Sequence, residues 1–476
     1  MNLLIKRTAP ALALLGLSLA SCQPDIEAPK ASAGSADFSS YIAVGNSLTA
    51  GYADGGLYRE GQLNSYPSIL ASQFAKVGGG NFVQPLFTEA QSNGAGYLRL
   101  TGFTATGTPT TAAVTSNLAV RGGTAQAPLY TQFLDPVNNL GVPGIRMSDI
   151  QTAGYGSTQG NPYFERLTPT ASAGQTYLQR VQATVAALKP TFFTEWLGNN
   201  DVLGYATAGG AASSLTSTAT FTTNTALVLD ALTAGGAKGL VATIPDVTGI
   251  PFFTTVGPSF KATLTANNVP GMIIMTGAAA GGPASGNRRQ IGTADIRDAN
   301  GGRQLFTLTA GAFLGLFNQP TAAPWQYIYA QSGQPAAGFP LFLAAYGIDT
   351  SKPFGTDPAN PIPSAFVLDD LEQTQVATAT AAFNGVLVAG ANARNLAVFD
   401  ANTFFRSVAA SGYVTNAVNN TAGYLSGNLF SLDGVHPTPR GYAVIANEML
   451  KATNAKYGST FSGVNPNSYR GVVFPQ

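Results

Sequence analysis

The only histidine of the 476-residue chain, His436, follows an aspartate by three positions in the stretch SLDGVHPTPRGY, residues 431–442. Histidine is the side chain whose ordinary pKa lies closest to neutral pH, so it can accept and release a proton under mild conditions. On a tight loop Asp433 can hold the Nδ1 proton, which leaves Nε2 free to accept another. The same spacing is also typical of a solvated turn. The pair predicts a general base only if the chain supplies a nucleophile as well.

A candidate nucleophile, Ser47, stands at the end of the apolar stretch YIAVGNS, residues 41–47. A turn from a strand into a helix can present a serine hydroxyl at the helix N-terminus, where backbone N–H groups stabilise a developing oxyanion. Serine is also a common helix cap, so Ser47 has this plain structural interpretation too.

Two further residues could serve the same oxyanion. Asn200 lies in GNND, residues 198–201, and its side-chain amide could point toward the developing charge. Gly144 ends the stretch NNLGVPG, where the missing side chain would let a backbone N–H approach a ligand closely. Asn and Asp after a strand are also ordinary turn residues, so each motif alone is weak.

Together the motifs occur in the order GNSL, NLGVPG, GNND and DGVHP. This order resembles the four signature blocks of the SGNH (GDSL) hydrolase family. The similarity covers about residues 38–77, 132–251 and 365–456. One position departs from the family pattern, because Asn46 stands where an aspartate usually precedes the serine. We expect this change to tune the nucleophile loop without loss of activity.

The resemblance implies a role for each motif. Ser47 would attack an ester carbonyl, and His436 would act as general base and then as general acid, oriented by Asp433. The oxyanion hole would consist of the backbone N–H groups of Ser47 and Gly144 and the side chain of Asn200. We therefore expect an ester hydrolase of the GDSL type.

The elements that must position these residues follow from the apolar pattern. Buried strands are expected within 41–47, 191–201, 239–246 and 396–400, because continuous apolar runs suit a parallel sheet covered on both faces. Helical patterns occupy 65–77, 174–189, 223–236, 368–391 and about 439–456, the last with Thr438 as N-cap and Pro439 in its first turn. The alternation predicts an α/β fold. The resemblance adds a flavodoxin-like three-layer α/β/α sandwich with a mainly parallel five-stranded sheet.

Two segments interrupt this alternation within the predicted SGNH hydrolase domain, residues 38–456. Residues 79–131 are rich in Gly, Thr and Ala without a clear period, and residues 251–364 form a longer insertion. The longer insertion contains two apolar patches, 269–275 and 336–348, which could wall an acyl pocket or simply pack as core. Residues 457–476 are expected to form a C-terminal extension.

The N-terminus has the pattern of an export signal. Residues 1–21 combine a basic start, an apolar segment and small residues, as in a lipoprotein signal peptide. Cys22 completes a lipobox-like LASC, which predicts lipidation of its thiol, although an ordinary signal peptide is the alternative. Residues 22–37 are small and polar and predict a flexible tether. We expect an exported bacterial lipoprotein anchored to the outer membrane by its lipid.

Composition excludes several other classes. Charged residues make up 10% of the chain and the net charge is +1 without a basic run, so nucleic acid is not an expected partner. One histidine and one cysteine are too few for a zinc or iron site. We expect no cofactor and no metal, and a single cysteine cannot form an intramolecular disulfide.

The expected partner is an ester substrate. Two substrate classes and one non-catalytic function remain open. The apolar patches and a membrane anchor favour lipid or acyl-chain esters. An esterase that removes acetyl groups from a polysaccharide is the second alternative, since the resembled family includes such enzymes. A third, of a different class, is a surface-binding lipoprotein that keeps an esterase scaffold without turnover.

Overall fold

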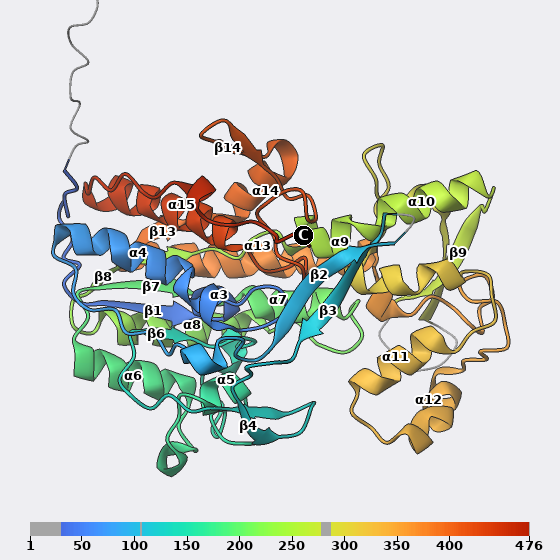
Figure 1. The fold of residues 1–476 in the computed structure, drawn as a ribbon, viewed down its shortest axis with the longest axis horizontal. Coiled ribbons are helices and arrows are strands. Elements are labelled where there is room, and N and C mark those ends of the chain that lie inside the picture. Colours follow the sequence, from blue (N-terminus) through green and yellow to red (C-terminus); the bar gives the residue numbers. More distant parts are fainter. Residues whose placement is uncertain (1–29, 105–106, 278–286, 476) are drawn as a thin grey trace, which may run out of the picture.

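A five-stranded, all-parallel sheet forms the centre of the computed structural model, which describes residues 30–104, 107–277 and 287–475 (Figure 1). Its spatial order is β13-β8-β7-β1-β6. The strands are β1 (Tyr41–Gly45), β6 (Asn139–Gly141), β7 (Phe192–Trp196), β8 (Lys238–Ala242) and β13 (Ala397–Phe399). Numbered along the chain, this order is 2-1-3-4-5, which is compatible with a flavodoxin-like sheet. The predicted α/β fold is confirmed.

Four of these strands were predicted: β1, β7 and β13 lie inside their predicted ranges, and β8 begins one residue before its range, at Lys238. Their residues are buried almost throughout. The fifth, β6, was not predicted as a strand. It has only three residues, and it pairs with β1 through Asn139, Leu140 and Gly141. A strand this short has no readable apolar period.

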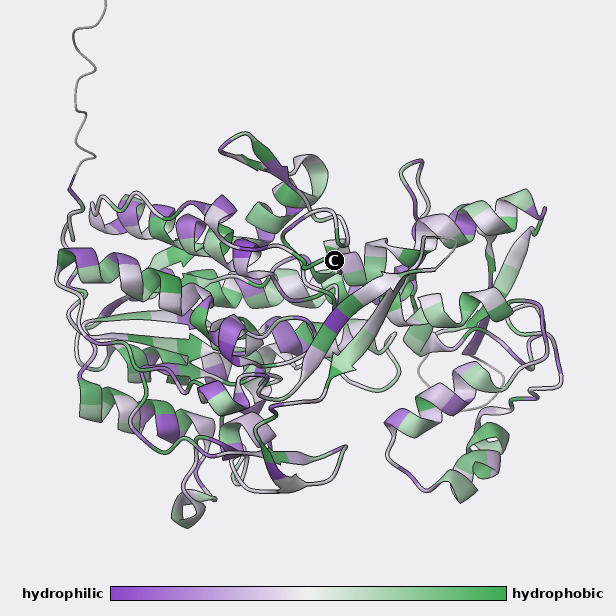
Figure 2. Cartoon of the chain, in the orientation of Figure 1, coloured by the Kyte–Doolittle hydropathy of each residue, from purple (hydrophilic) through white to green (hydrophobic). Residues whose placement is uncertain are grey.

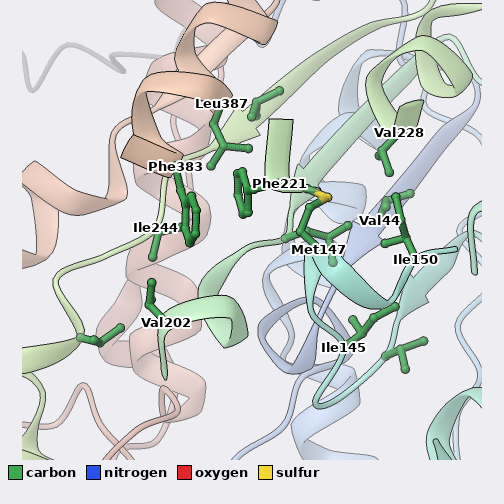
Figure 3. Packing of buried hydrophobic residues seen from close by; sticks show 14 of the residues in the cluster. Val44, Ile145, Met147, Ile150, Val202, Phe221, Val228, Ile244, Phe383 and Leu387 are labelled. Carbon is green, nitrogen blue, oxygen red and sulfur yellow. The ribbon is translucent and has the colours of Figure 1, made fainter. Parts of the chain in front are cut away.

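Helices cover both faces of the sheet. Helices α4 (Tyr66–Phe74) and α15 (Pro439–Tyr457) pack on one face, and α6 (Tyr177–Leu188), α8 (Thr218–Thr233) and α13 (Asp370–Ala393) pack on the other. Figure 3 shows the second layer, where Phe221 lies beside Phe383 and Val44 of β1 lies beside Ile150. The rings of Phe221 and Phe383 stack with centroids 4.1 Å apart, which joins α8 to α13.

The predicted helices are confirmed, with one boundary difference. Helix α8 begins at Thr218 rather than near residue 223, because Ser217 caps it by accepting a hydrogen bond from the Thr220 N–H. Helix α15 begins as predicted, with Thr438 as N-cap and Pro439 in the first turn. Short helices complete the core domain: α2 (Ser47–Ala50), α3 (Arg59–Leu63), α5 (Pro162–Glu165), α7 (Asn199–Thr207) and α14 (Ala401–Ser411).

Helix α13 is long and apolar enough to cross a membrane by length and composition, and it is the only such helix in the described ranges. In the structure it packs against α8, α7, β8 and β13. Phe383, Leu387 and Ala391 of this helix are fully buried in the core. We interpret α13 as a core helix.

The segment 79–131 contains two antiparallel hairpins that were not predicted. Strands β2 (Tyr97–Phe103) and β3 (Pro109–Val114) form the longer hairpin, and β4 (Val120–Gly123) and β5 (Pro128–Tyr130) form the shorter one. The strand residues are mostly exposed and rich in Thr, Gly and Ala. Apart from Leu98 and Leu100 of β2, these strands have no alternating large apolar residues in the sequence, and this explains why they were missed.

The long insertion has an apolar core of its own and lies to one end of the sheet (Figure 1). The patch 269–275 contains β9, whose Met272 and Ile274 are buried in that core. The patch 336–348 forms α12, which has no buried residue and leaves Leu341 77% exposed (Figure 2). The elements are α9 (Pro251–Thr254), α10 (Val256–Ala266), β9 (Gly271–Met275), β10 (Arg288–Gly292), β11 (Leu305–Phe306), α11 (Ala323–Gln331) and α12 (Phe339–Tyr346).

Two small pairings follow the insertion. Strand β12 (Val367–Leu368) pairs with β11, and β14 (Tyr413–Thr415) pairs with β15 (Val418–Asn420). The first pairing connects the insertion to the segment that leads into α13.

Both ends of the described chain pack onto the sheet domain. The sequence predicts a flexible tether up to residue 37, whereas Ser35 donates its N–H to the Tyr457 carbonyl at 2.8 Å and Ala36 is buried. In the predicted C-terminal extension, Phe461 is buried against Phe38 and Phe74. The predicted signal peptide 1–21, the lipidation site Cys22 and tether residues 22–29 lie outside the described residues.

Candidate active site

Ser47, His436 and Asp433 form a continuous chain of hydrogen bonds at the carboxyl end of β1. The His436 Nε2 lies 2.9 Å from the Ser47 Oγ, although the two residues are 389 positions apart. On the other side of the ring, His436 Nδ1 lies 2.8 Å from Asp433 Oδ2. With Nδ1 protonated toward the carboxylate, Nε2 is placed to accept the serine proton.

The Asp433 carboxylate is fixed by several donors besides the imidazole. Oδ1 accepts the backbone N–H groups of Val435 and His436, both at 2.8 Å, and Oδ2 accepts that of Gly55 at 2.9 Å. Burial by itself would raise the pKa of Asp433, but the charge of His436 and these hydrogen bonds outweigh it and lower the pKa to about 2. Asp433 is therefore ionised at all ordinary pH values, as an orienting carboxylate must be.

The turn into α2 presents the serine. Asn46 caps this turn, since its Oδ1 accepts the Leu48 N–H at 3.0 Å. An aspartate carboxylate could accept the same bond, so the cap survives the departure from the family pattern noted above. Within the described ranges, the Ser47 N–H has no hydrogen-bond acceptor. This N–H is free to donate to a developing oxyanion.

Asn200 is joined to the loop that holds Gly144. Its Nδ2 donates to the Ile145 carbonyl at 2.9 Å, which fixes the side chain next to that loop. Gly144 has a φ of +84°, a value that favours glycine, and its N–H has no acceptor in the part of the chain that the structure describes. The structure thus brings the second and third motifs together. Gly144 itself is exposed, and it does not line the pocket that adjoins Ser47 and His436.

Asp201 also holds the loop that follows Gly144, through hydrogen bonds to its backbone. It is fully buried and accepts the N–H groups of Met147 at 2.7 Å and Ser148 at 3.2 Å, and the Thr216 hydroxyl at 2.6 Å. Burial raises the pKa of Asp201 to about 6 despite these hydrogen bonds. Asn200 and Asp201 together therefore hold residues 145–148 against α7.

The loop that carries Asp433 and His436 is supported from three sides. Within the loop, the Ser431 N–H donates to the His436 carbonyl at 2.8 Å. From the long insertion, the Phe252 N–H donates to the Gly434 carbonyl at 2.9 Å. From the segment after α2, the buried carboxylate of Asp54 accepts the Leu432 N–H at 3.0 Å.

An open pocket of about 370 Å³, including the part exposed to solvent, adjoins Ser47 and His436. Asn199 in its lining is 5% exposed, and both polar atoms of its side chain lack a partner among the described residues. Because these two atoms are also shielded from solvent, Asn199 is a buried amide with unsatisfied hydrogen-bonding capacity at the wall of the pocket. The other lining residues are mostly apolar: Leu48, Asn200, Leu203, Pro245, Val247, Ile250 and Val435.

Sequence reasoning missed three residues of this site. Asn199 had a readable signal, because it sits beside Asn200 in the same motif. Asp201 was quoted in that motif without a role, and Asp54 had no signal at all. The contact between Asp54 and Leu432 joins positions 378 apart, so only folding reveals it.

No cluster of three or more His, Cys, Asp or Glu residues able to hold a metal occurs in residues 30–104, 107–277 and 287–475. The chain matches no protein-family model, no curated protein and no solved structure in the three comparisons made. The site is therefore interpreted from its own geometry.

Proposed function

We propose that the protein is a serine-dependent carboxylic ester hydrolase that acts through an acyl-enzyme. The observation that carries this proposal is the hydrogen-bond chain from Ser47 Oγ through His436 to Asp433. A plain turn or helix cap needs neither of these two contacts.

The geometry supports the following sequence of steps. Ser47 Oγ attacks the ester carbonyl carbon while His436 Nε2 takes the hydroxyl proton, and the ionised Asp433 stabilises the imidazolium that forms. The negative oxygen of the tetrahedral intermediate accepts hydrogen bonds from the free N–H group of Ser47 and from Asn200, which both line the pocket. Gly144 also has a free N–H but lies outside the pocket lining, so only the family resemblance assigns it to the oxyanion hole. His436 then returns its proton to the leaving alcohol. Water repeats the steps on the acyl-enzyme and releases the acid.

The test is ester hydrolysis by purified variants. Ser47→Ala and His436→Ala should each lower kcat by roughly 10⁴-fold or more on a nitrophenyl ester, because the serine and histidine act as a unit. Ser72→Ala on α4 is the matched control and should keep full activity, since its hydroxyl bonds only the Ile69 carbonyl and the neighbouring Gln73 side chain, both on the same helix. Substantial residual activity in Ser47→Ala would end the proposal.

Labelling separates this proposal from a binding lipoprotein without turnover. A serine-directed phosphonate should modify Ser47 in the native chain and leave Ser47→Ala unmodified. A native chain that is folded yet neither labelled nor active would favour the non-catalytic alternative.

The structure removes one argument for lipid substrates. Neither apolar patch of the insertion lines the catalytic pocket, because β9 is core and α12 lies exposed at the far end. Removal of acetyl groups from a glycan is therefore our second candidate. Nitrophenyl esters from acetate to long chains decide between the two: a sharp preference for acetate supports the glycan, and activity that rises toward octanoate supports the lipid.

A further inference from the structure

A groove that is larger than the pocket beside Ser47 lies on the other side of that pocket's wall. Pro245, Val247 and Ile250 line the catalytic pocket, whereas Asp246 and Thr248, which alternate with them, line the groove. One chain thickness therefore separates the two. The groove holds about 850 Å³, including its solvent-open part, compared with about 370 Å³ for the catalytic pocket.

Two arginines reach this groove from distant parts of the chain. Arg303 comes from the long insertion and Arg406 comes from α14. Neither guanidinium has an ion-pair or hydrogen-bond partner in residues 30–104, 107–277 and 287–475. The backbone at Arg303 is fixed, because its carbonyl accepts the Gln373 Nε2 of α13 at 2.6 Å. In a chain with only 10% charged residues, two unpaired guanidiniums in one groove are a distinctive feature.

The remaining lining is mostly uncharged and polar. Asp246 is the one carboxylate, and its Oδ1 is already occupied by the N–H and hydroxyl of Thr248 at 2.9 and 2.7 Å. Helix α13 lines the groove from Gln373 to Asn384 with residues three or four positions apart. The twelve residues from Gln373 to Asn384 extend about 16 Å along the helix, which is longer than a single small anion needs.

We propose that this groove binds an acidic oligosaccharide whose carboxylates pair with Arg303 and Arg406. Guanidinium groups match carboxylates in a bidentate geometry. On α13, Gln373 Nε2 is already used by two backbone carbonyls, but Gln373 Oε1 and the threonine hydroxyl oxygens can still accept hydrogen bonds from sugar hydroxyls. The inference rests on the proposed function in one respect, because the bound glycan would carry the ester that Ser47 cleaves. It also gives the insertion a role, since the groove is complete only where Arg303 meets α13 and α14.

Binding is measured by calorimetry on the full chain carrying Ser47→Ala, so that turnover plays no part. The probe is an unesterified oligogalacturonate of four to six units, with the fully methyl-esterified oligomer as its neutral match. We expect the acid oligomer to bind, to weaken as salt rises, and to bind at least tenfold more weakly when Arg303→Gln and Arg406→Gln are combined. The neutral oligomer should bind far more weakly than the acid one.

Arg297→Gln is the matched control, because Arg297 is an exposed arginine of the same insertion outside the groove. It should leave binding unchanged, and circular dichroism should show every variant folded. Equal binding of the acid and neutral oligomers, or no loss on removing both groove arginines, would overturn the proposal. So would vesicles of an anionic phospholipid that bind through these arginines while the oligogalacturonate does not. An inactive native chain that still binds the acid oligomer through the groove would refute the esterase proposal alone.

Discussion

At the scale of single residues, Asn200 offers the most informative substitution. One Nδ2 hydrogen is used by the Ile145 carbonyl, which leaves the second hydrogen of the same amide for an oxyanion. Asn200→Ala should lower kcat by about 10²–10³-fold, or roughly 2.7–4 kcal/mol of transition-state stabilisation. Steady-state kinetics on a nitrophenyl ester measure the effect.

Asn267→Ala on α10 is the matched control, because its Nδ2 also donates to a backbone carbonyl, that of Thr263, but outside the catalytic pocket. If Asn200→Ala instead raises KM and leaves kcat unchanged, Asn200 binds the substrate equally in the ground state and the transition state. That result would contradict the oxyanion role.

Sequence order was enough to locate the residues that the structure joins by hydrogen bonds, namely Ser47, Asp433 and His436. Each sits in a short motif whose residue types already indicate chemistry. Asn199 and Asp54 were not found. Asn199 matters because its side chain is buried without partners, and burial is a property of the fold rather than of the motif.

At the scale of elements, strand β7 contains a carboxyl group in an apolar layer. Glu195 is fully buried, its Oε1 accepts the Leu197 N–H at 3.0 Å, and burial raises its pKa to about 8. A carboxyl with a raised pKa in the folded state favours folding while it is protonated. Stability should therefore be highest below about pH 4.5, as far as Glu195 contributes, and should fall as the pH rises toward about 8.

Glu195→Gln should remove this dependence, because the amide keeps the shape and never ionises. The free energy of unfolding of the native chain should fall relative to that of the variant by at most about 1.4 kcal/mol per pH unit between these limits. Denaturant titrations at several pH values provide the measurement. Parallel pH profiles for the two proteins would show that Glu195 is ionised in the folded state.

A helix or strand could be predicted from the sequence where its apolar residues are continuous or recur at a regular spacing. Strands β1, β7, β8 and β13 are continuous buried runs, and they were found. Strand β6 has three residues, β3 consists mostly of small and polar residues, and β2 has only a short apolar alternation at Leu98 and Leu100. Their pairing partners, rather than their composition, make them strands.

At the scale of the whole molecule, the C-terminal segment contacts the residues that follow α2, through Arg470. Arg470 binds both carboxylate oxygens of Glu60 at 2.6 and 2.8 Å and donates to the Tyr58 hydroxyl at 2.9 Å. Tyr58 in turn donates to Asp54, which supports the loop of Asp433. Arg470→Gln should lower the free energy of unfolding by about 1–3 kcal/mol, since hydrogen bonds to charged groups are lost. It should also reduce kcat/KM.

Arg394→Gln is the control, because its partner Asp230 has a side chain that is 66% exposed and such pairs contribute about 0–1 kcal/mol. Chemical denaturation and ester hydrolysis are measured on both variants. Equal, small effects of the two substitutions would mean that the C-terminal segment does not support the site.

The attachment of residues 32–40 has a consequence for orientation. Ser40 donates its N–H to Thr191 Oγ1 at 3.0 Å, just before β7, and Lys238 at the start of β8 donates to the Ser35 carbonyl. Both contacts lie at the amino ends of the strands, whereas Ser47 follows the carboxyl end of β1. The first described residues thus lie at the end of the sheet opposite to the pocket beside Ser47 and His436, so this part of the chain does not obstruct access to the pocket.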